Sequence, residues 1–206
     1  MDSRARRADL VALLITCALG LPLVYLMAAA YAEGEVRRHE TPVRALLGAG
    51  PYEALREGHV SDQHYMGNDR LAPDFSLPAS DGTTFRLSDH RGKVIVLNFW
   101  TVTCQPCVEE MPSFTMLARM LEGRDDIELV TISVDSDWDT VRTVVPEDSP
   151  LMVLLDEDRS VVNDQFGTRL FPETWIIDGE GVIRLRVDGR RNWSDSIVID
   201  VIESYL

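Results

Sequence analysis

The chain contains the stretch Val94-Ile-Val-Leu-Asn-Phe-Trp100 and, three residues further on, Cys104-Gln-Pro-Cys107. The first stretch is a nearly continuous apolar run, which is typical of a strand covered on both faces. Apolar residues at helical spacing follow the second cysteine, from Val108 to Leu121. The cysteines therefore lie at a strand-to-helix junction. The first turn of a helix brings residues i and i+3 to one face, close enough for a disulfide.

The position of the two cysteines indicates dithiol–disulfide exchange. A helix N-terminus carries partial positive charge, which favours the thiolate form of the first cysteine. We expect Cys104 to be the attacking thiol and Cys107 to be the thiol that resolves the mixed disulfide. A disulfide across so short a loop contributes little to stability, so the pair is interpreted as reactive rather than structural.

Periodicity on both sides of this junction predicts an α/β fold. Alternating residues around Asp81-Gly82 predict a β-hairpin formed by residues 75–77 and 84–87. Strands and helices alternate after residue 94, and a second hairpin follows. This order predicts a mixed central sheet with helices on both faces. Further strands are expected at 127–134, 151–155, 174–178 and 182–187, and helices at 138–145, at 160–166 and from a Ser194 cap to 204.

The N-terminal segment Leu10–Ala32 contains no charged residue and is long enough to cross a bilayer as one helix. Arginines precede it and glutamates follow it, so the positive-inside bias keeps residues 1–9 in the cytoplasm and places the rest outside. We predict a transmembrane anchor at 10–32, a juxtamembrane spacer at 33–70 and the folded domain at 71–206. The irregularly spaced spacer histidines are expected to be solvated rather than metal ligands; they are His39, His59 and His64.

Two alternatives to an uncleaved anchor remain. Ala30-Tyr-Ala32 resembles a signal peptidase site, so the segment could be a cleaved signal peptide. Its apolar run is longer than that of a typical signal peptide, which favours the anchor. A lipid attachment site at Cys17 is disfavoured because Thr16 precedes it and the apolar run continues well beyond it.

The charge of the chain argues against nucleic-acid binding. The formal net charge is −14, and the portion after residue 9 carries −15. A nucleic-acid-binding protein needs a basic stripe that this composition does not offer. No flavin or nicotinamide motif was found either, so we predict no cofactor and expect electrons to come from another protein.

Eight short motifs follow one another in a familiar order. They are Ala72-Pro-Asp-Phe-Ser-Leu77, Leu87-Ser-Asp89, Gly92–Trp100, the Cys-x-Pro-Cys, Glu110-Met-Pro112, Ile132-Ser-Val-Asp135, Leu154-Leu-Asp156 and Phe171-Pro-Glu-Thr-Trp-Ile-Ile-Asp178. This order resembles the membrane-anchored thioredoxin-like proteins of the TlpA/ResA type over residues 72–206. The resemblance implies a thioredoxin fold with an extra N-terminal β-hairpin. It also implies a location outside the cytoplasm, in the periplasm, on a single-pass protein of the inner membrane.

The same resemblance implies a reaction and its partners. Members of this type exchange thiols and disulfides, commonly as reductants, and several act on apocytochrome c before haem attachment. A membrane thiol transporter normally supplies their electrons. Carried over by motif, Cys104 matches an exposed nucleophile and Cys107 a buried resolving thiol. Pro172 matches a proline with a cis peptide bond that lies beside the disulfide and presents the Phe171 backbone to a substrate strand.

Three further positions bear on the chemistry. Glu110 matches an acidic residue that influences proton transfer at the cysteines. Asn98 occupies the strand position where plain thioredoxins bury an aspartate, which makes Glu110 the better candidate for handling protons. Thr103 departs from the family, which usually has tryptophan or another bulky residue before the first cysteine. Its hydroxyl could donate to a thiolate, and this leaves the redox potential and the substrate open.

Other functions share this architecture. A thiol oxidase or isomerase differs only in potential. A copper-delivery protein typically has wider cysteine spacing and a later histidine, whereas the last histidine here is His90. A thiol peroxidase is partly suggested by Thr101-x-x-Cys104, but the expected upstream proline is missing. A binding module without catalysis is disfavoured by the intact cysteine pair.

Overall fold

The computed structural model describes residues 20–32, 34, 42–46, 48 and 70–206. The chain divides into two units, Met1–Thr41 and Pro42–Leu206. In the first unit, residues 20–32 are helical. Within the described ranges, no helix is both long and apolar enough to cross a membrane. Part of the predicted anchor, residues 10–19, lies outside the described residues, as do residues 1–9, Cys17, His39, His59 and His64.

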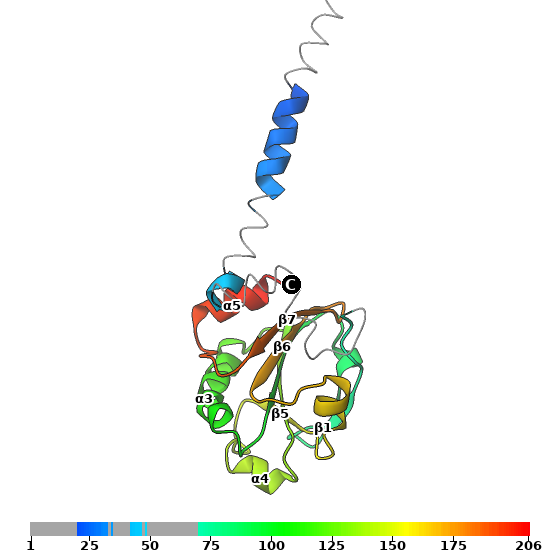
Figure 1. Ribbon diagram of the computed structural model, residues 1–206, viewed down its shortest axis with the longest axis vertical. Helices are drawn as coiled ribbons and strands as arrows, with labels where there is room; N and C mark the ends of the chain where they lie inside the picture. The colour runs from blue at the N-terminus through cyan, green and yellow to red at the C-terminus, as the bar shows by residue number, and fades with distance from the viewer. Residues whose placement is uncertain (1–19, 33, 35–41, 47, 49–69) are drawn as a thin grey trace, which may run out of the picture. The chain divides into compact units, whose positions relative to one another are not determined.

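A five-stranded mixed sheet forms the centre of the second unit (Figure 1). The strand order is β5-β4-β3-β6-β7, with β3 in the middle. Strands β4, β5 and β7 run in the same direction as β3, and β6 alone runs antiparallel to its two neighbours, β3 and β7. The bounds are Val94–Trp100 for β3, Ile127–Ser133 for β4, Met152–Leu155 for β5, Glu173–Ile177 for β6 and Ile183–Asp188 for β7. Every residue of β3 is buried, as its apolar run predicts.

The predicted N-terminal hairpin is present as β1 (Ser76–Pro78) and β2 (Thr84–Arg86), paired antiparallel. Gly82 has a positive φ of 84° in the connecting turn, a conformation that glycine adopts without steric strain. The Asp81 carboxylate accepts hydrogen bonds from the backbone N–H and the hydroxyl of Thr83. An Asp-Gly turn between alternating strands is therefore enough to define this hairpin.

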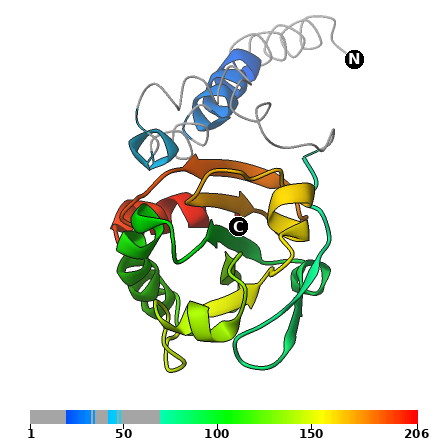
Figure 2. The same cartoon turned by 60° about the horizontal axis from the view of Figure 1, so that its bottom comes forward.

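The two faces of the sheet are covered differently (Figures 1 and 2). Helices α3 (Gln105–Met120), α4 (Trp138–Arg142) and α5 (Ser196–Glu203) pack on the face that carries Val94, Val96 and Trp100. The hairpin and the one-turn helix η2 (Ser160–Gln165) cover the opposite face, which carries Ile95, Leu97 and Phe99. A 3₁₀ turn, η1 (Leu87–His90), follows β2. The expectation of helices on both faces holds only in part, because a hairpin and a π-helical turn replace regular helices on the second face.

Helix boundaries deviate from the sequence prediction at two places. Helix α4 ends at Arg142 rather than Val145. The prediction that Ser194 caps the last helix is wrong, because the Asp195 carboxylate accepts a hydrogen bond from the Ile197 N–H. The Ser194 hydroxyl instead donates to the side-chain oxygen of Asn192 at 2.7 Å. Asp and Ser are equally good N-caps, so only the backbone path decides which of two neighbours serves.

The second unit begins within the segment predicted as a spacer. Residues 42–46 form a short helix, and the side chain of Val43 is only 5% exposed. Val43 belongs to the same apolar cluster as Val198, Val201 and Ile202 of α5. At least this turn of the predicted spacer therefore contributes to the core of the folded unit.

Candidate active site

The loop after β3 delivers the cysteines to the start of α3. Cys104 is the N-cap residue of α3, with extended backbone angles. Its sulfur accepts a hydrogen bond from the Cys107 N–H at 3.2 Å, so it occupies the place where a serine or aspartate side chain commonly caps a helix. Pro106 follows in the first turn, a position that tolerates the missing N–H. The strand and the helix together place Cys104 at the positive end of a helix dipole.

Cys104 and Cys107 are joined by a disulfide, with 5.2 Å between their Cα atoms. The two sulfurs differ in exposure. Cys107 is completely buried and belongs to the core cluster beneath α3, whereas Cys104 is partly exposed at its edge. An incoming thiolate or disulfide can thus reach Cys104 more readily than Cys107.

Pro172 lies at the same end of the sheet as the cysteines. The Phe171–Pro172 peptide bond is cis, as the family resemblance implied. Strand β6 begins at the next residue, Glu173, which pairs with Phe99 near the end of β3. This register puts Pro172 opposite the end of β3 that leads to Cys104. Phe171 and Cys104 both pack against the core cluster beneath α3.

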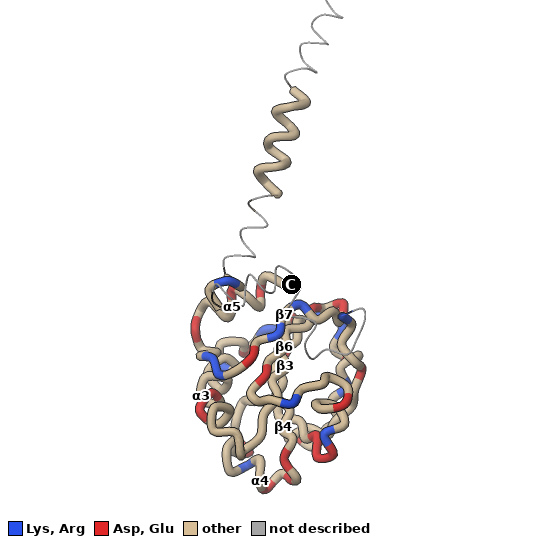
Figure 3. The backbone as a smooth tube through the Cα atoms, in the orientation of Figure 1, with Lys and Arg blue, Asp and Glu red and all other residues tan. Residues whose placement is uncertain are grey.

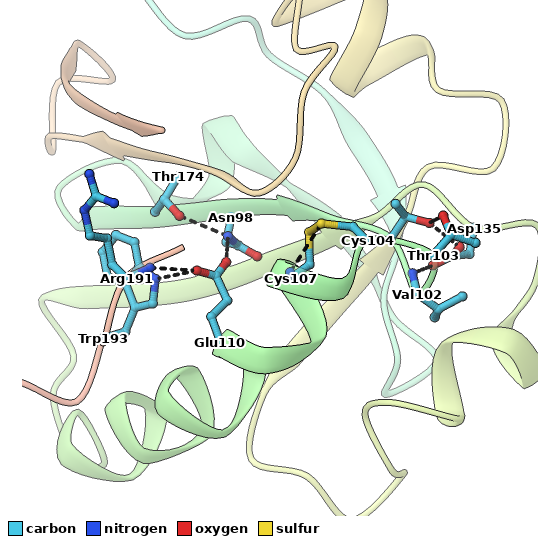
Figure 4. Close-up of a disulfide and its surroundings, with 11 residues drawn as sticks. Asn98, Val102, Thr103, Cys104, Cys107, Glu110, Asp135, Thr174, Arg191 and Trp193 are labelled. Carbon is cyan, nitrogen blue, oxygen red and sulfur yellow. Dashed lines mark hydrogen bonds between the residues drawn. A yellow bond between two sulfur atoms is a disulfide. The ribbon is translucent and has the colours of Figure 1, made fainter. Parts of the chain in front are cut away.

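Glu110 is buried on α3, only 1% exposed, one turn after Cys107 (Figure 4). Its Oε1 accepts a hydrogen bond from Asn98 Nδ2 at 3.1 Å. Its Oε2 accepts from the Trp193 indole Nε1 at 3.2 Å and from the Arg191 backbone N–H at 3.3 Å. Asn98 Nδ2 also donates to the Thr174 hydroxyl at 3.0 Å. The carboxyl group is thereby connected to β3 and to the loop between β7 and α5.

Burial raises the pKa of Glu110 to about 7, although the hydrogen bonds from Arg191, Trp193 and Asn98 oppose the increase. Removing a carboxylate from water disfavours its charge, which is why the neutral form persists to so high a pH. A group that titrates near neutral pH can both accept and release a proton at the pH of most compartments. Glu110 and Cys107 are three residues apart on one helix and therefore share a face.

A second buried carboxyl group, which the sequence reasoning missed, follows Pro172 directly. Glu173 is 2% exposed, accepts a hydrogen bond from the Thr168 hydroxyl at 2.8 Å and lies 3.2 Å from Arg186 Nε. Burial raises the pKa of Glu173 to about 7, against the opposing charge of Arg186. The available signal was a glutamate between Pro172 and a mostly apolar strand, at the first position of β6. Such a residue is rarely buried without a partner.

Within the described part of the chain, the Thr103 hydroxyl forms no hydrogen bond to a sulfur. Its hydroxyl lies 3.3 Å from the hydroxyl of Thr101, which in turn donates to Asp135 Oδ1 at 2.6 Å. Asp135 also accepts a hydrogen bond from the Val102 N–H at 3.0 Å. In the sequence, Asp135 stands out only as the last residue of the Ile132–Asp135 motif, which predicts no role for its carboxylate.

A mixed sheet whose central strand leads into a Cys-x-x-Cys at a helix N-terminus, with a cis-proline at the same end, defines a thioredoxin fold. The protein is a thiol–disulfide oxidoreductase of this class. A family model described as the AhpC/TSA family matches residues 69–186. The chain belongs to this AhpC/TSA family of thioredoxin-like proteins.

Individual relatives agree with this assignment. The thiol-disulfide oxidoreductase ResA of Bacillus subtilis (strain 168) is 31% identical over 144 residues, which cover 69% of this chain and 77% of ResA. The thioredoxin-like protein YneN of the same organism is 33% identical over 117 residues, covering 55% and 66%. Among solved structures, the exposed lipoprotein thioredoxin Etrx1 of Streptococcus pneumoniae strain TIGR4 is similar, with a TM-score of 0.55 and 26% identity. That match covers 64% of this chain and 98% of Etrx1.

Proposed function

We propose that this protein is an extracytoplasmic reductant of protein disulfides, with Cys104 as the nucleophile and Cys107 as the resolving thiol. The observation that carries the proposal is the unequal exposure of the two cysteines, partly exposed Cys104 against fully buried Cys107. A thiol–disulfide exchange enzyme needs one accessible cysteine that forms the mixed disulfide with the partner protein. It also needs a second cysteine, shielded from the partner, that attacks this mixed disulfide.

The reaction follows from this arrangement in two balanced steps. The thiolate of Cys104 attacks a partner disulfide, forming a mixed disulfide and releasing one partner thiolate. Cys107 then loses its proton and attacks the Cys104 sulfur, which frees the second partner thiolate and forms the Cys104–Cys107 disulfide. Two electrons pass to the partner, and another thiol protein must return them before the next cycle.

Glu110 is proposed to handle the proton of Cys107. Its pKa of about 7 suits this task, and the carboxyl group lies on the same helical face one turn away. Replacing it by Gln should flatten the dependence of Cys107 reactivity on pH between about 6 and 8. Glu109→Gln is the matched control, because Glu109 is the exposed neighbour paired with Arg190. Identical pH profiles for wild type and Glu110→Gln would remove Glu110 from the mechanism.

Pro172 is proposed to line the substrate position. Its place opposite the end of β3 leaves the preceding backbone, at Phe171, available to pair with an extended segment of the partner. Such pairing would hold the mixed disulfide in line for attack by Cys107. Pro172→Ala should therefore slow reduction of a protein disulfide more than reaction with a small disulfide. An equal effect on both would argue against substrate pairing.

The location and the natural partner are proposed from sequence and relatives together. The uncharged segment 10–32 would anchor the protein in the inner membrane, with the folded domain in the periplasm. The name of Etrx1 describes an exposed lipoprotein, which supports a place outside the cytoplasm for this fold. Apocytochrome c is the proposed substrate and a membrane thiol transporter the proposed electron donor. A shorter mature form that disappears when signal peptidase is inhibited would contradict the anchor.

The test is the reduction potential of the cysteine pair in the full-length protein, measured by equilibration with glutathione. A value near that of thioredoxin, about −270 mV, supports a reductant, whereas a value near −120 mV would identify an oxidant. A Cys107→Ser variant expressed in cells should accumulate mixed disulfides with its substrates, and Cys104→Ser should not. Rapid peroxide consumption by the reduced protein would favour the peroxidase alternative.

A further inference from the structure

Asp135 lies just beyond the end of β4 and is 7% exposed. Its carboxylate accepts three hydrogen bonds. One is local, from the Ser133 hydroxyl at 2.7 Å. The other two come from the loop that leads to Cys104, from the Thr101 hydroxyl at 2.6 Å and the Val102 N–H at 3.0 Å. These two bonds connect the end of β4 to a loop 33 and 34 residues earlier in the chain, so Asp135 does more than stabilise its own turn.

These bonds restrain the loop close to the nucleophile. Val102 is two residues before Cys104, and the Cys104 N–H donates to the Thr101 carbonyl at 3.1 Å. Val134 adds a further connection, because its N–H donates to the Trp100 carbonyl at 3.1 Å. Asp135 therefore holds the beginning of the turn from Thr101 to Cys104, and the hydrogen bond between Cys104 and Thr101 closes the turn. A buried charge-assisted hydrogen bond is about twice as strong as a neutral one.

The number of protons available on Thr101, Thr103 and Asp135 determines which group donates in each hydrogen bond of this chain. An ionised carboxylate has no proton to give, so the single hydroxyl proton of Thr101 is used in its bond to Asp135. In the 3.3 Å contact between the two threonine hydroxyls, Thr103 must then be the donor. A chain runs from Thr103, next to the nucleophile, through Thr101 to Asp135. The residue that departs from the family pattern is thus tied to this carboxylate.

We propose that Asp135 is a positioning residue for Cys104, which holds the Thr101–Cys104 turn and whose negative charge disfavours the Cys104 thiolate. The inference rests on the proposed exchange at Cys104. Figure 4 shows the Asp135 cluster and Glu110 on opposite sides of the disulfide. Destabilising the thiolate stabilises the disulfide relative to the dithiol, which lowers the reduction potential and suits a reductant.

Other charged groups lie on the neighbouring elements, and all of them except Glu110, which accepts neutral hydrogen bonds, form ion pairs. They are Glu109 and Glu110 on α3, Glu173 on β6, Arg186 on β7 and Arg190 in the loop after β7. Glu109 is paired with Arg190, and Glu173 with Arg186. Asp135 receives its hydrogen bonds from hydroxyl groups and a backbone amide, and among the residues that the structure describes no Lys, Arg or His forms an ion pair with it.

Two substitutions separate the effect of the Asp135 charge on the thiolate from the effect of its hydrogen bonds on the Thr101–Cys104 turn. Asp135→Asn removes the charge and keeps the shape, while Thr101→Val keeps the charge and removes one hydrogen bond. In the full-length protein, we expect Asp135→Asn to shift the equilibrium with glutathione about tenfold toward the dithiol, or about 30 mV upward. We expect Thr101→Val to slow reduction of insulin disulfides about tenfold, because the nucleophile is less well held. Thr101→Ser retains the hydroxyl and should restore the rate.

Asp139→Asn is the matched control, since its carboxylate is 97% exposed on α4 and its loss changes the net charge equally. If Asp135→Asn and Thr101→Val both match this control in potential and in rate, the role of Asp135 is refuted. If Asp135→Asn does not fold, as judged by circular dichroism, the Thr101 variants decide alone. A wild-type protein that neither equilibrates with glutathione nor reduces insulin would refute the proposed function itself, and this inference with it.

Discussion

The carboxylate of Glu110 and the indole of Trp193 form a hydrogen bond of 3.2 Å between two side chains that are at most 1% exposed. The bond connects the helix of the cysteines to the loop before α5, and Trp193 also stacks on Phe114 of α3 with 4.8 Å between ring centroids. The protonation state of Glu110 is therefore coupled to the environment of a buried indole. This coupling makes the carboxyl group accessible to fluorescence as well as to kinetics.

Trp193→Phe should raise the pKa of Glu110 further above its present value of about 7. The substitution keeps an aromatic ring against Phe114 but removes the N–H that stabilises the carboxylate. Loss of one hydrogen bond to a charged group corresponds to about 1.5 kcal/mol, or roughly one pKa unit. The measurement is the pH dependence of Cys107 alkylation in the reduced protein. Trp138→Phe, in α4, is the control and should leave the profile in place.

The two buried glutamates should make the protein less stable as the pH rises. Each has a pKa near 4.5 in the unfolded chain and about 7 in the folded one. The folded state therefore binds more protons between these values, and the stability present below pH 4.5 is lost as the pH rises through 7. For each group the loss is roughly 3 kcal/mol. Denaturant unfolding at several pH values should show a smaller loss for Glu110→Gln and for Glu173→Gln, but not for Glu109→Gln.

Asn98→Asp should create a pair of carboxyl groups that share one proton. Asn98 Nδ2 lies 3.1 Å from Glu110 Oε1, so an aspartate there would face Glu110 at hydrogen-bond distance. Two like charges this close in a buried site cannot both ionise easily, so the second ionisation should move above pH 8. The variant should lose more stability at pH 8 than at pH 5. Equal losses at the two pH values would show that the groups do not interact.

Arg186→Met should destabilise the protein mainly at alkaline pH. Arg186 is 10% exposed, lies 3.2 Å from the Glu173 carboxylate and stands over the Trp175 ring at 5.5 Å. Without it, an ionised Glu173 is buried unpaired, which costs about 3–5 kcal/mol, whereas at pH 5 the protonated group tolerates burial better. Arg142→Met is the control, because Arg142 is 41% exposed and its partners Asp139 and Glu147 are exposed carboxylates. Adding Glu173→Gln to Arg186→Met should recover most of the loss at pH 8.

Much of the fold could be predicted because its signals are local. The apolar run 94–100 predicted a strand buried on both faces, and Asp81-Gly82 predicted the hairpin; both are confirmed. Acidic and basic residues are interspersed over the second unit in Figure 3, so its negative charge is not gathered in one place. The boundaries of α4 and α5 were less accurate, since several adjacent residues could cap or extend a helix equally well.

The candidate site was predictable only where it depends on neighbours in the chain. Cys104 and Cys107 could be assigned to one face because they are three residues apart at the start of a helix. The hydrogen-bond partners of Glu110 could not be predicted, because Asn98, Arg191 and Trp193 are 12, 81 and 83 residues away from it. Glu173 and Asp135 went unassigned for the same reason, since a buried carboxylate looks like any other acidic residue in a sequence.

By itself, the sequence determined the central strand, the cysteine pair at the following helix and the kind of chemistry that such a pair can perform. Those features depend on hydrophobic periodicity and on spacing within one turn, which are properties of adjacent residues. Tertiary structure alone decided which carboxyl groups are buried, which hydrogen bonds hold them and which loops surround the disulfide. Burial and long-range partners set the pKa of a group, and they exist only once the strands and helices have packed together.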